Sequence, residues 1–388
     1  MNSDALRYIA FSRSDITDED LQQAAGVMKD SERDTHRLLR ECEHTFAGLT
    51  QSPSAIAVTT AMQAVLLSLR ALGIQDGNEV IIPSYAGPDI GEAVEHSGAS
   101  AVFADIDGRT LTISAESVSA GIGHKTKAVV VLDTAGLAAD LGALLKVAAA
   151  NGVYVIHYTY YNPYREYRHT IAGTYPQITI FANDDPLIKG AFITSDMEKT
   201  QSSIRSLREH GITAAKNSDG PERSGNWYYE ITKPGFDCMM TGLQCALYTV
   251  CLNKTAASLG RRKHIVEIYS NVLKSLPDKL LLPAFDPSAA GHTWQGYTLR
   301  IIKDALLLNR DEFIQELKQK GVEASVHYIP LHIHPYYSRK YKYAYNILPH
   351  TYDAYTSAVS LPLYAQLRDD DAIAVAQTVI DVVKRYAR

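Results

Sequence analysis

The stretch KAVVVLDTAGLAADLGALLKVAAANGVYVIHY, residues 127–158, decides the fold class of this chain. Its two ends, 127–133 and 153–158, are short apolar runs typical of buried strands. Between them, 138–152 has the length and apolar spacing of a helix. A strand, a helix and a second strand in this order predict two parallel strands joined by a helical crossover.

The same alternation continues on both sides of this stretch. Residues 57–73 run from a short strand end into an amphipathic helix that Gly73 closes. Further buried strands are predicted at EVIIPS (79–84), AVFADID (101–107), ITIFAN (178–183) and GAFITSD (190–196). We therefore expect a large domain, 1–281, built on a doubly wound and mostly parallel sheet. Such a sheet binds its ligand at the carboxyl ends of the strands.

The pattern changes after residue 281. LPAFDPSAAGH (282–292) has the composition of a linker. It is followed by predicted strands at 297–303 and 324–330 and by predicted helices at 309–321 and 369–386. These elements predict a small C-terminal α/β domain, 282–388.

Composition excludes several classes of partner. The chain has 388 residues, with 38 Lys and Arg against 43 Asp and Glu, and so a net charge of −5. This balance argues against nucleic acid or an anionic membrane as a partner. Neither a spanning apolar run nor a secretion signal is visible, so we expect a cytoplasmic protein. The four cysteines form no C-x-x-C pair and are expected to be reduced thiols rather than a metal site.

Several further motifs occur in an order that is similar to one known family. They are FSRSDITDEDL (11–21), RALGIQDGNEVIIPS (70–84), ISAESV (113–118), HGIT (210–213), WYYE (227–230), MTGLQCAL (240–247), HTWQGYTLRI (292–301), VHYIPLHIHPYY (326–337) and SLPLY (360–364). In this order the chain resembles the DegT-type nucleotide-sugar aminotransferases over roughly residues 8–385. The resemblance implies the fold type I of pyridoxal-phosphate enzymes, and a dimer whose active sites are built from both chains.

The position of the family's catalytic lysine is altered. In the family this lysine forms a Schiff base with pyridoxal phosphate, within a segment that here reads IFANDD (180–185). Asp185 stands at the lysine position, and a carboxylate cannot form an imine. Ile180 replaces a serine that would bond the cofactor phosphate. Lys189 follows a shortened loop; it is either an ordinary exposed lysine or, if the loop folds differently, a residue that reaches the site.

Other cofactor contacts implied by the resemblance are altered too. The family's Glu-Asp pair at the pyridine nitrogen reads His157-Tyr158, and a tyrosine hydroxyl does not hold a pyridinium as a carboxylate does. The phosphate-binding helix start reads Thr60-Ala61-Met62 in place of Ser-Gly-Thr. Two further positions differ: the ring-stacking aromatic is Gly87, and an Asn-x-Arg motif contributed across the dimer is Asp237-Cys238-Met239.

These changes predict a degenerate family member that uses no cofactor and is not an active aminotransferase. We expect a pyridoxal-phosphate-independent enzyme of a biosynthetic pathway, acting on a nucleotide sugar or a small metabolite. One alternative is a non-catalytic ligand-binding or regulatory subunit that pairs with an active family member. A third interpretation retains an aminotransferase or dehydratase that uses unlinked cofactor or Lys189.

The candidate site residues are those expected around the old cofactor position. A histidine beside carboxylates can act as a general acid–base unit. The predicted catalytic residues are His157, Tyr158, Asp184 and Asp185. The predicted ligand-binding residues are Thr60, Asp133, Tyr160, Tyr161, Asp237 and His327. Alternatively, these groups only fill and hydrogen-bond the space that the cofactor would leave.

Metal binding and assembly complete the expectations. His327, His332 and His334 lie close together in the sequence, but their stretch resembles a family motif that binds no metal, so no metal is expected. A small molecule is the expected ligand. We expect a homodimer, since the dimer-side segments around Trp227 and from Met240 are retained; a heterodimer with an active paralogue is the alternative.

Overall fold

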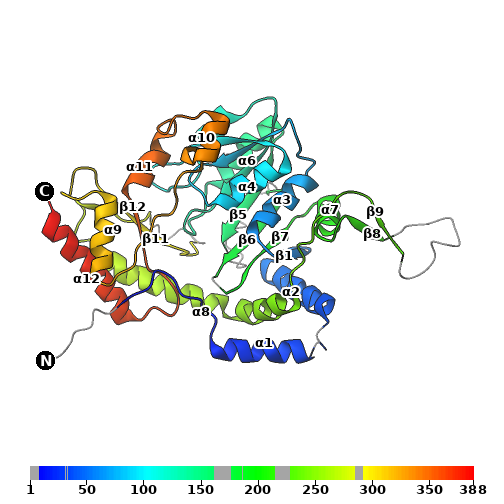
Figure 1. Cartoon of the computed structure of the whole chain (residues 1–388), viewed down its shortest axis with the longest axis horizontal. Coiled ribbons are helices and arrows are strands. Elements are labelled where there is room, and N and C mark those ends of the chain that lie inside the picture. The colour runs from blue at the N-terminus through cyan, green and yellow to red at the C-terminus, as the bar shows by residue number, and fades with distance from the viewer. Residues whose placement is uncertain are drawn as a thin grey trace.

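The computed structural model describes residues 8–30, 32, 34–160, 176–185, 187–214, 228–284 and 292–388. Its main body is a seven-stranded sheet with helices on both faces (Figure 1). The strand order is β1 (Ala55–Val58), β7 (Lys189–Thr194), β6 (Ile178–Asp184), β5 (Tyr154–Tyr160), β4 (Thr126–Leu132), β2 (Glu79–Pro83) and β3 (Ser100–Ala104).

The sheet is mostly parallel, as the sequence predicts. Strands β3, β2, β4, β5 and β6 run parallel to one another, whereas β7 is antiparallel to both β6 and β1. The predicted strands of this region all form within a few residues of their expected bounds. The expected fold class, a doubly wound α/β sheet of the fold type I kind, is confirmed.

Helices cover the sheet in three groups. One face packs against α3 (Ala61–Ala71), α4 (Pro88–Ser97) and α7 (Glu198–Arg208). The opposite face packs against α5 (Ala115–Gly121) and α6 (Leu141–Asn151) under its parallel strands. Under β1, β6 and β7 the same face packs against α2 (Thr35–Thr50) and α8 (Gly242–Leu273).

Local sequence explains where these helices begin and end. Thr60 caps α3, because its hydroxyl accepts a hydrogen bond from the backbone N–H of Gln63. Thr241 and Gln244 form a reciprocal capping box at the start of α8. Gly152 ends α6 in the left-handed conformation, at φ 64°, which glycine adopts without a steric penalty.

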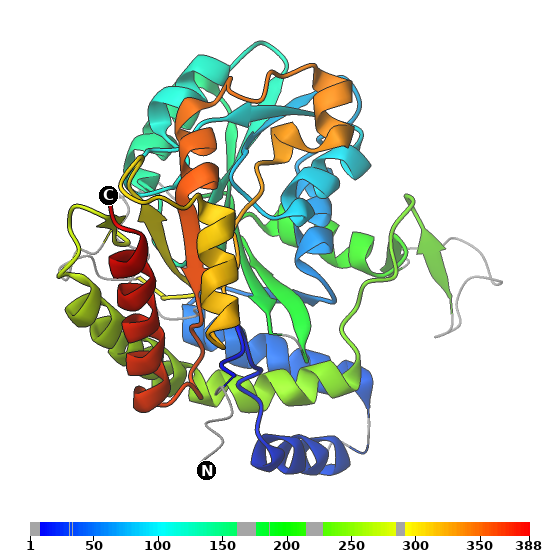
Figure 2. The same cartoon turned by 60° about the vertical axis from the view of Figure 1, so that its left-hand side comes forward.

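The C-terminal part forms a smaller α/β unit beside the sheet (Figure 2). Its three-stranded antiparallel sheet has the order β10 (Leu280–Leu281), β11 (Tyr297–Ile301) and β12 (Ala358–Leu361). The helices of this part of the chain are α9 (Arg310–Gln319), α10 (Pro335–Tyr341), α11 (Pro349–Ser357) and α12 (Asp369–Tyr386), with a 3-10 turn, η3 (Leu331–Ile333).

One predicted strand is wrong. Residues 324–330 form no strand and contact the small sheet only through the bridge between Ser325 and Ser360. The chain leaves the sheet here because it crosses to the large domain, where Tyr328 contacts Tyr160. Strand β12 is the third member of the sheet instead.

Helix α8 joins the two parts. Its first half packs with α1 (Asp18–Asp30) and α2, whereas Ile265, Tyr269 and Leu273 belong to the core of the smaller unit. That core also contains Leu280, so its packing begins before the expected boundary at residue 282. Strands β8 (Ile212–Ala214) and β9 (Tyr229–Ile231) form a separate ribbon that extends away from the body in both views (Figures 1 and 2).

Candidate functional site

The alternation of side chains along β5 divides the predicted site residues between the two faces of the sheet. Tyr158 and Tyr160 lie in the core cluster shared with α3 and α4. His157, one residue before Tyr158, points to the opposite face, toward α6. The sequence analysis grouped these three residues in one cavity, but the pleat of the strand separates His157 from the tyrosines.

Asp133, directly after β4, and His157, in the middle of β5, form a buried pair. His157 Nε2 lies 3.0 Å from Asp133 Oδ2, and the two side chains are 2% and 0% exposed. Asp133 Oδ1 also accepts a hydrogen bond from the backbone N–H of Ala139. The pair therefore links β4, β5 and the segment before α6, on the face away from α3.

Tyr158 has a carboxylate partner that sequence reasoning missed. Its hydroxyl donates a hydrogen bond of 2.5 Å to Asp89 Oδ2, in the first turn of α4. Burial raises the pKa of Asp89, and the hydrogen bond from Tyr158 opposes that shift. A carboxylate thus stands directly behind the tyrosine that replaces the family's aspartate. The signal that could have found it is Gly87-Pro88-Asp89, a helix start at the carboxyl edge of the sheet.

Tyr328 is the second residue that was missed. Its hydroxyl lies 2.7 Å from the hydroxyl of Tyr160. A Cβ added to Gly87 would lie 3.7 Å from the Tyr328 ring and 2.9 Å from Asp89 Oδ1. An aromatic ring therefore lies beside the position where the family's stacking residue is absent. Neighbouring His327 stacks on Phe11 at 5.2 Å, and burial lowers its pKa.

The start of α3 retains the features of an anion site. The first amides of a helix have no carbonyl partner within it, and they attract anions. Thr60 lies at this end, and the hydroxyls of Thr59 and Thr60 both contact the side chain of Gln63. The carbonyl of Cys238 accepts from the backbone N–H of Thr59. The segment of Asp237, whose side chain is exposed, therefore runs alongside this helix start.

Lys189 lies at the same edge of the sheet. Strand β1 pairs with β7 from Ala55 with Thr194 to Val58 with Ala191. Continuing this register by two residues brings Thr60 level with Lys189. Side chains alternate along β7, and Ala191 packs in the α3 cluster, so Lys189 shares the face of α3. On its other side Lys189 pairs with Asp184 of β6.

Asp185, in the loop at this edge, is hydrogen-bonded to the N-terminal segment. Its carboxylate accepts hydrogen bonds from Ser14 Oγ at 2.8 and 2.9 Å, from the backbone of Asp15 and from that of Leu187. These bonds tie the N-terminal segment to the loop between β6 and β7. Tyr161, Trp227 and the side chain of Asp184 lie outside what the structure describes.

The histidines of 326–337 have separate surroundings. His332 is buried between Ser84 Oγ, 2.6 Å from its Nδ1, and the carbonyl of Tyr345, 3.0 Å from its Nε2. His334 caps α10. Among the described residues, no group of three or more His, Cys, Asp or Glu is placed to hold a metal ion. None of the described helices has the length and apolar character that crossing a membrane requires.

The fold and the residues at this edge define a fold type I transferase-like protein. The chain belongs to the DegT/DnrJ/EryC1/StrS aminotransferase family, whose model matches residues 14–380. It is 31% identical over 382 residues to the spore coat polysaccharide biosynthesis protein SpsC of Bacillus subtilis, covering 97% of each chain. It is 33% identical over 348 residues to MJ1066 of Methanocaldococcus jannaschii, covering 88% of this chain and 89% of the other.

Solved structures share the fold. The protein Spr1654 of Streptococcus pneumoniae superposes with a TM-score of 0.84 at 24% identity, over 97% of this chain and 99% of the other. It has been solved in PLP and PMP forms. PseC of Helicobacter pylori, an aminotransferase of pseudoaminic acid biosynthesis, has a TM-score of 0.84 at 18% identity, over 98% and 100% of the two chains.

These findings correct the expected function. The expectation of an enzyme that is not an aminotransferase, or of a non-catalytic subunit, is wrong, because the chain matches an aminotransferase family along nearly its whole length. The expected independence from pyridoxal phosphate is not supported either, since matched structures include PLP and PMP forms. The error came from judging each cofactor contact at one sequence position. A carboxylate such as Asp89, which contacts Tyr158 only in the folded chain, is not visible in that comparison.

Proposed function

We propose that this chain is a sugar aminotransferase in which Lys189 supplies the amine that Asp185 cannot. The observation that carries the proposal is the register of β1 with β7, which pairs Val58 with Ala191 and, if continued, brings the exposed Lys189 toward Thr60 on the α3 face of the sheet. In this proposal the lysine that is absent at position 185 is replaced by Lys189, four residues further along a shortened loop. Its relatives SpsC and PseC are named for polysaccharide and pseudoaminic acid biosynthesis, so a keto sugar is the proposed acceptor.

The residues present fit pyridoxal phosphate at four points. The amides at the start of α3 would hold the phosphate. Lys189 would hold the aldehyde. Tyr328 offers a ring beside Gly87, and Tyr158, backed by Asp89, offers a hydroxyl where the family has a carboxylate. When bound, pyridoxal phosphate supplies an aldehyde that takes up an amino group and a ring that withdraws electrons.

The chain's own groups then have distinct tasks. Lys189 Nζ, once free, would carry a proton to and from the carbon at which the amino group is exchanged. The Tyr158 hydroxyl would orient the ring through its nitrogen, with Asp89 holding the hydroxyl in place. The buried tyrosines Tyr158 and Tyr160 exclude water from this side of the site.

The proposal is tested by trapping the covalent bond to the lysine. The protein is incubated with pyridoxal phosphate, reduced with borohydride and mapped by peptide mass. We expect the phosphopyridoxyl group on Lys189. We expect Lys189→Met to lose the adduct and to lower the rate of amino transfer to a nucleotide-linked keto sugar by about 10²–10⁴-fold.

Lys199→Met is the matched control, because Lys199 is an exposed lysine of α7, outside the site. It should leave both the adduct and the transfer rate as in the wild type. A wild-type protein that carries no adduct, or carries it on another lysine, would refute the role of Lys189.

A further inference from the structure

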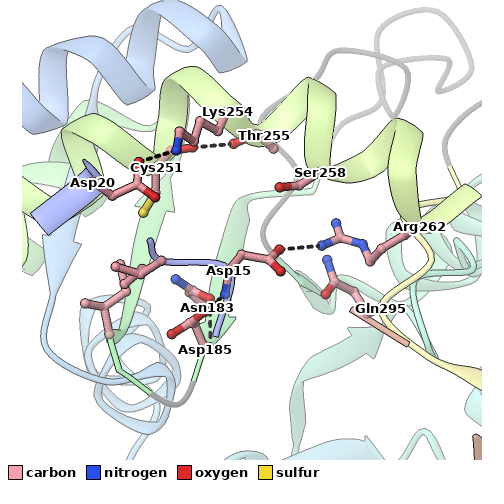
Figure 3. A pocket seen from close by; sticks show the side chains of 12 residues that line it. Asp15, Asp20, Asn183, Asp185, Cys251, Lys254, Thr255, Ser258, Arg262 and Gln295 are labelled. Atoms are coloured by element: carbon pink, nitrogen blue, oxygen red, sulfur yellow. Dashed lines mark hydrogen bonds and ion pairs between the residues drawn. The ribbon is translucent and has the colours of Figure 1, made fainter. Parts of the chain in front are cut away.

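A cavity that is separate from the proposed cofactor site lies beside the loop between β6 and β7 (Figure 3). It has a volume of about 90 Å³, and its walls come from the N-terminal segment, this loop and α8. About 10–15 Å³ suffices for one water, so a molecule of a few non-hydrogen atoms fits. Its charged lining residues are Asp15, Asp20, Asp185, Lys254 and Arg262.

Three of these charged groups are already paired or hydrogen-bonded. Lys254 forms an ion pair with Asp20, whose other oxygen accepts from Thr17. Asp185 accepts hydrogen bonds from Ser14, Asp15 and Leu187 but has no ion pair with a cation in the described part of the chain. The lining therefore carries three carboxylates and two cations, and lacks one positive charge.

Arg262 has a hydrogen-bond donor that no described residue accepts. Its side chain is 12% exposed, and its Nη1 lies 3.6 Å from Asp15 Oδ2, which is longer than a normal hydrogen bond. Its buried Nε has no acceptor among the described residues. Figure 3 shows the guanidinium pointing toward Asp15 and Gln295 across the cavity. An unsatisfied buried donor is costly, and an acceptor brought by a ligand would remove that cost.

Asp15 faces the same gap. Burial raises the pKa of Asp15, the charge of Arg262 opposes this shift, and the nearby charge of Asp185 adds to it. A cation placed between Asp15 and Asp185 would relieve this repulsion. A ligand that fits this cavity therefore places a hydrogen-bond acceptor at Arg262 and a positive charge at Asp15.

We propose that this cavity binds a small zwitterionic α-amino acid. The ligand carboxylate accepts a hydrogen bond from Nε of Arg262, and the ligand ammonium lies against Asp15. Such a ligand satisfies both groups without adding net charge. The cavity volume selects glycine or alanine over larger side chains.

This ligand is distinct from a reacting amino donor. The cavity lies on the α8 side of the sheet, whereas Lys189 lies on the α3 side. Both sites are joined through the same loop, in which Asp185 is bonded to the N-terminal segment. The inference rests on the cavity alone and stands whether or not Lys189 has its proposed role.

Calorimetric titration of the full chain tests the proposal. Glycine and L-alanine should bind saturably in the low millimolar range or tighter. Acetate and ethylamine, which carry only one of the two charges, should each bind at least about tenfold more weakly. Arg262→Gln should weaken glycine binding by at least about tenfold, whereas Lys263→Gln, an exposed cation next to it on α8, should not.

A cavity-filling variant keeps the test decisive if Arg262→Gln does not fold. Ser258 lines the cavity and Ala257 is its exposed neighbour. Ser258→Leu should abolish glycine binding, and Ala257→Leu should retain it. The proposal is overturned if the wild type binds neither amino acid, or if Ser258→Leu binds glycine like the wild type.

Discussion

At the scale of single residues, folding brings together groups that lie far apart in the sequence. Tyr158 places a hydroxyl where the resemblance implies a carboxylate, and Asp89 places the carboxylate directly behind that hydroxyl. Pattern matching compares one position at a time, so it records the loss at 158 and misses the gain at 89.

Burial determines the protonation state of His292 in the folded protein. Its ring stacks on Trp294 at 3.5 Å, and its Nδ1 accepts a hydrogen bond of 3.1 Å from the Trp294 backbone N–H. A nitrogen that accepts a hydrogen bond carries no proton. Burial lowers the pKa of His292 from 6.5 to about 3. The folded protein therefore keeps this imidazole neutral.

We predict that this histidine makes the protein less stable in acid. Between pH 6.5 and pH 3 the unfolded chain binds a proton that the folded chain excludes, so stability falls as pH falls. From pH 7 to pH 5 the loss should be about 2 kcal/mol, as measured by urea denaturation at both values. His292→Gln should remove most of this difference. His36→Gln, an exposed histidine on α2, is the matched control, and an unchanged pH dependence in His292→Gln would contradict the assignment.

At the scale of elements, Glu43 of α2 fastens three of them together. Its Oε1 accepts from the backbone of Ala57 in β1 at 2.9 Å and from Arg208 at 2.5 Å. Its Oε2 accepts from Arg205 at 2.8 Å. Both arginines, from α7, also donate to carbonyls of β1. The network holds the edge strand that leads into the start of α3, and thereby positions Thr60.

Removing this carboxylate should be costly. Glu43→Ala leaves the buried guanidinium of Arg208 without its main partner, so we expect a loss of about 3–5 kcal/mol of unfolding free energy. Glu41→Ala, on the same helix, removes an exposed pair with Arg37 and should cost under about 0.5 kcal/mol. Denaturant titration of the two variants measures the difference. Equal effects would show that the Glu43 network adds nothing to stability.

At the scale of the whole molecule, exposed apolar side chains gather on the segments that the resemblance assigns to a dimer. Tyr229 and Ile231 of β9 are 57% and 63% exposed, and Leu243 at the start of α8 is 54% exposed. The side-chain amide of Gln244 donates to the carbonyl of Lys189, so this surface adjoins the proposed site. Exposed apolar side chains on both of these segments favour a protein partner.

The homodimer stays a prediction, and Leu243 offers a direct test. Leu243→Glu would bury a charge in the interface, so we expect the dimer to dissociate at micromolar concentration. Sedimentation velocity distinguishes the two states. Ile373→Glu, at an equally exposed apolar residue on α12, should remain dimeric. A wild-type monomer at these concentrations would refute the dimer itself.

The sequence by itself determined the architecture. Apolar runs and helix caps are local signals, so the strands from 55 to 194 and the helices at 61–71, 141–151, 310–319 and 369–386 followed from it. The tertiary structure alone decided which site residues meet. Strand pleating separated His157 from Tyr158, and strand pairing placed Lys189 beside Asp184 at the end of β6. Asp89 met Tyr158 across 69 residues, and contacts between residues so far apart depend on packing in three dimensions, which no local pattern encodes.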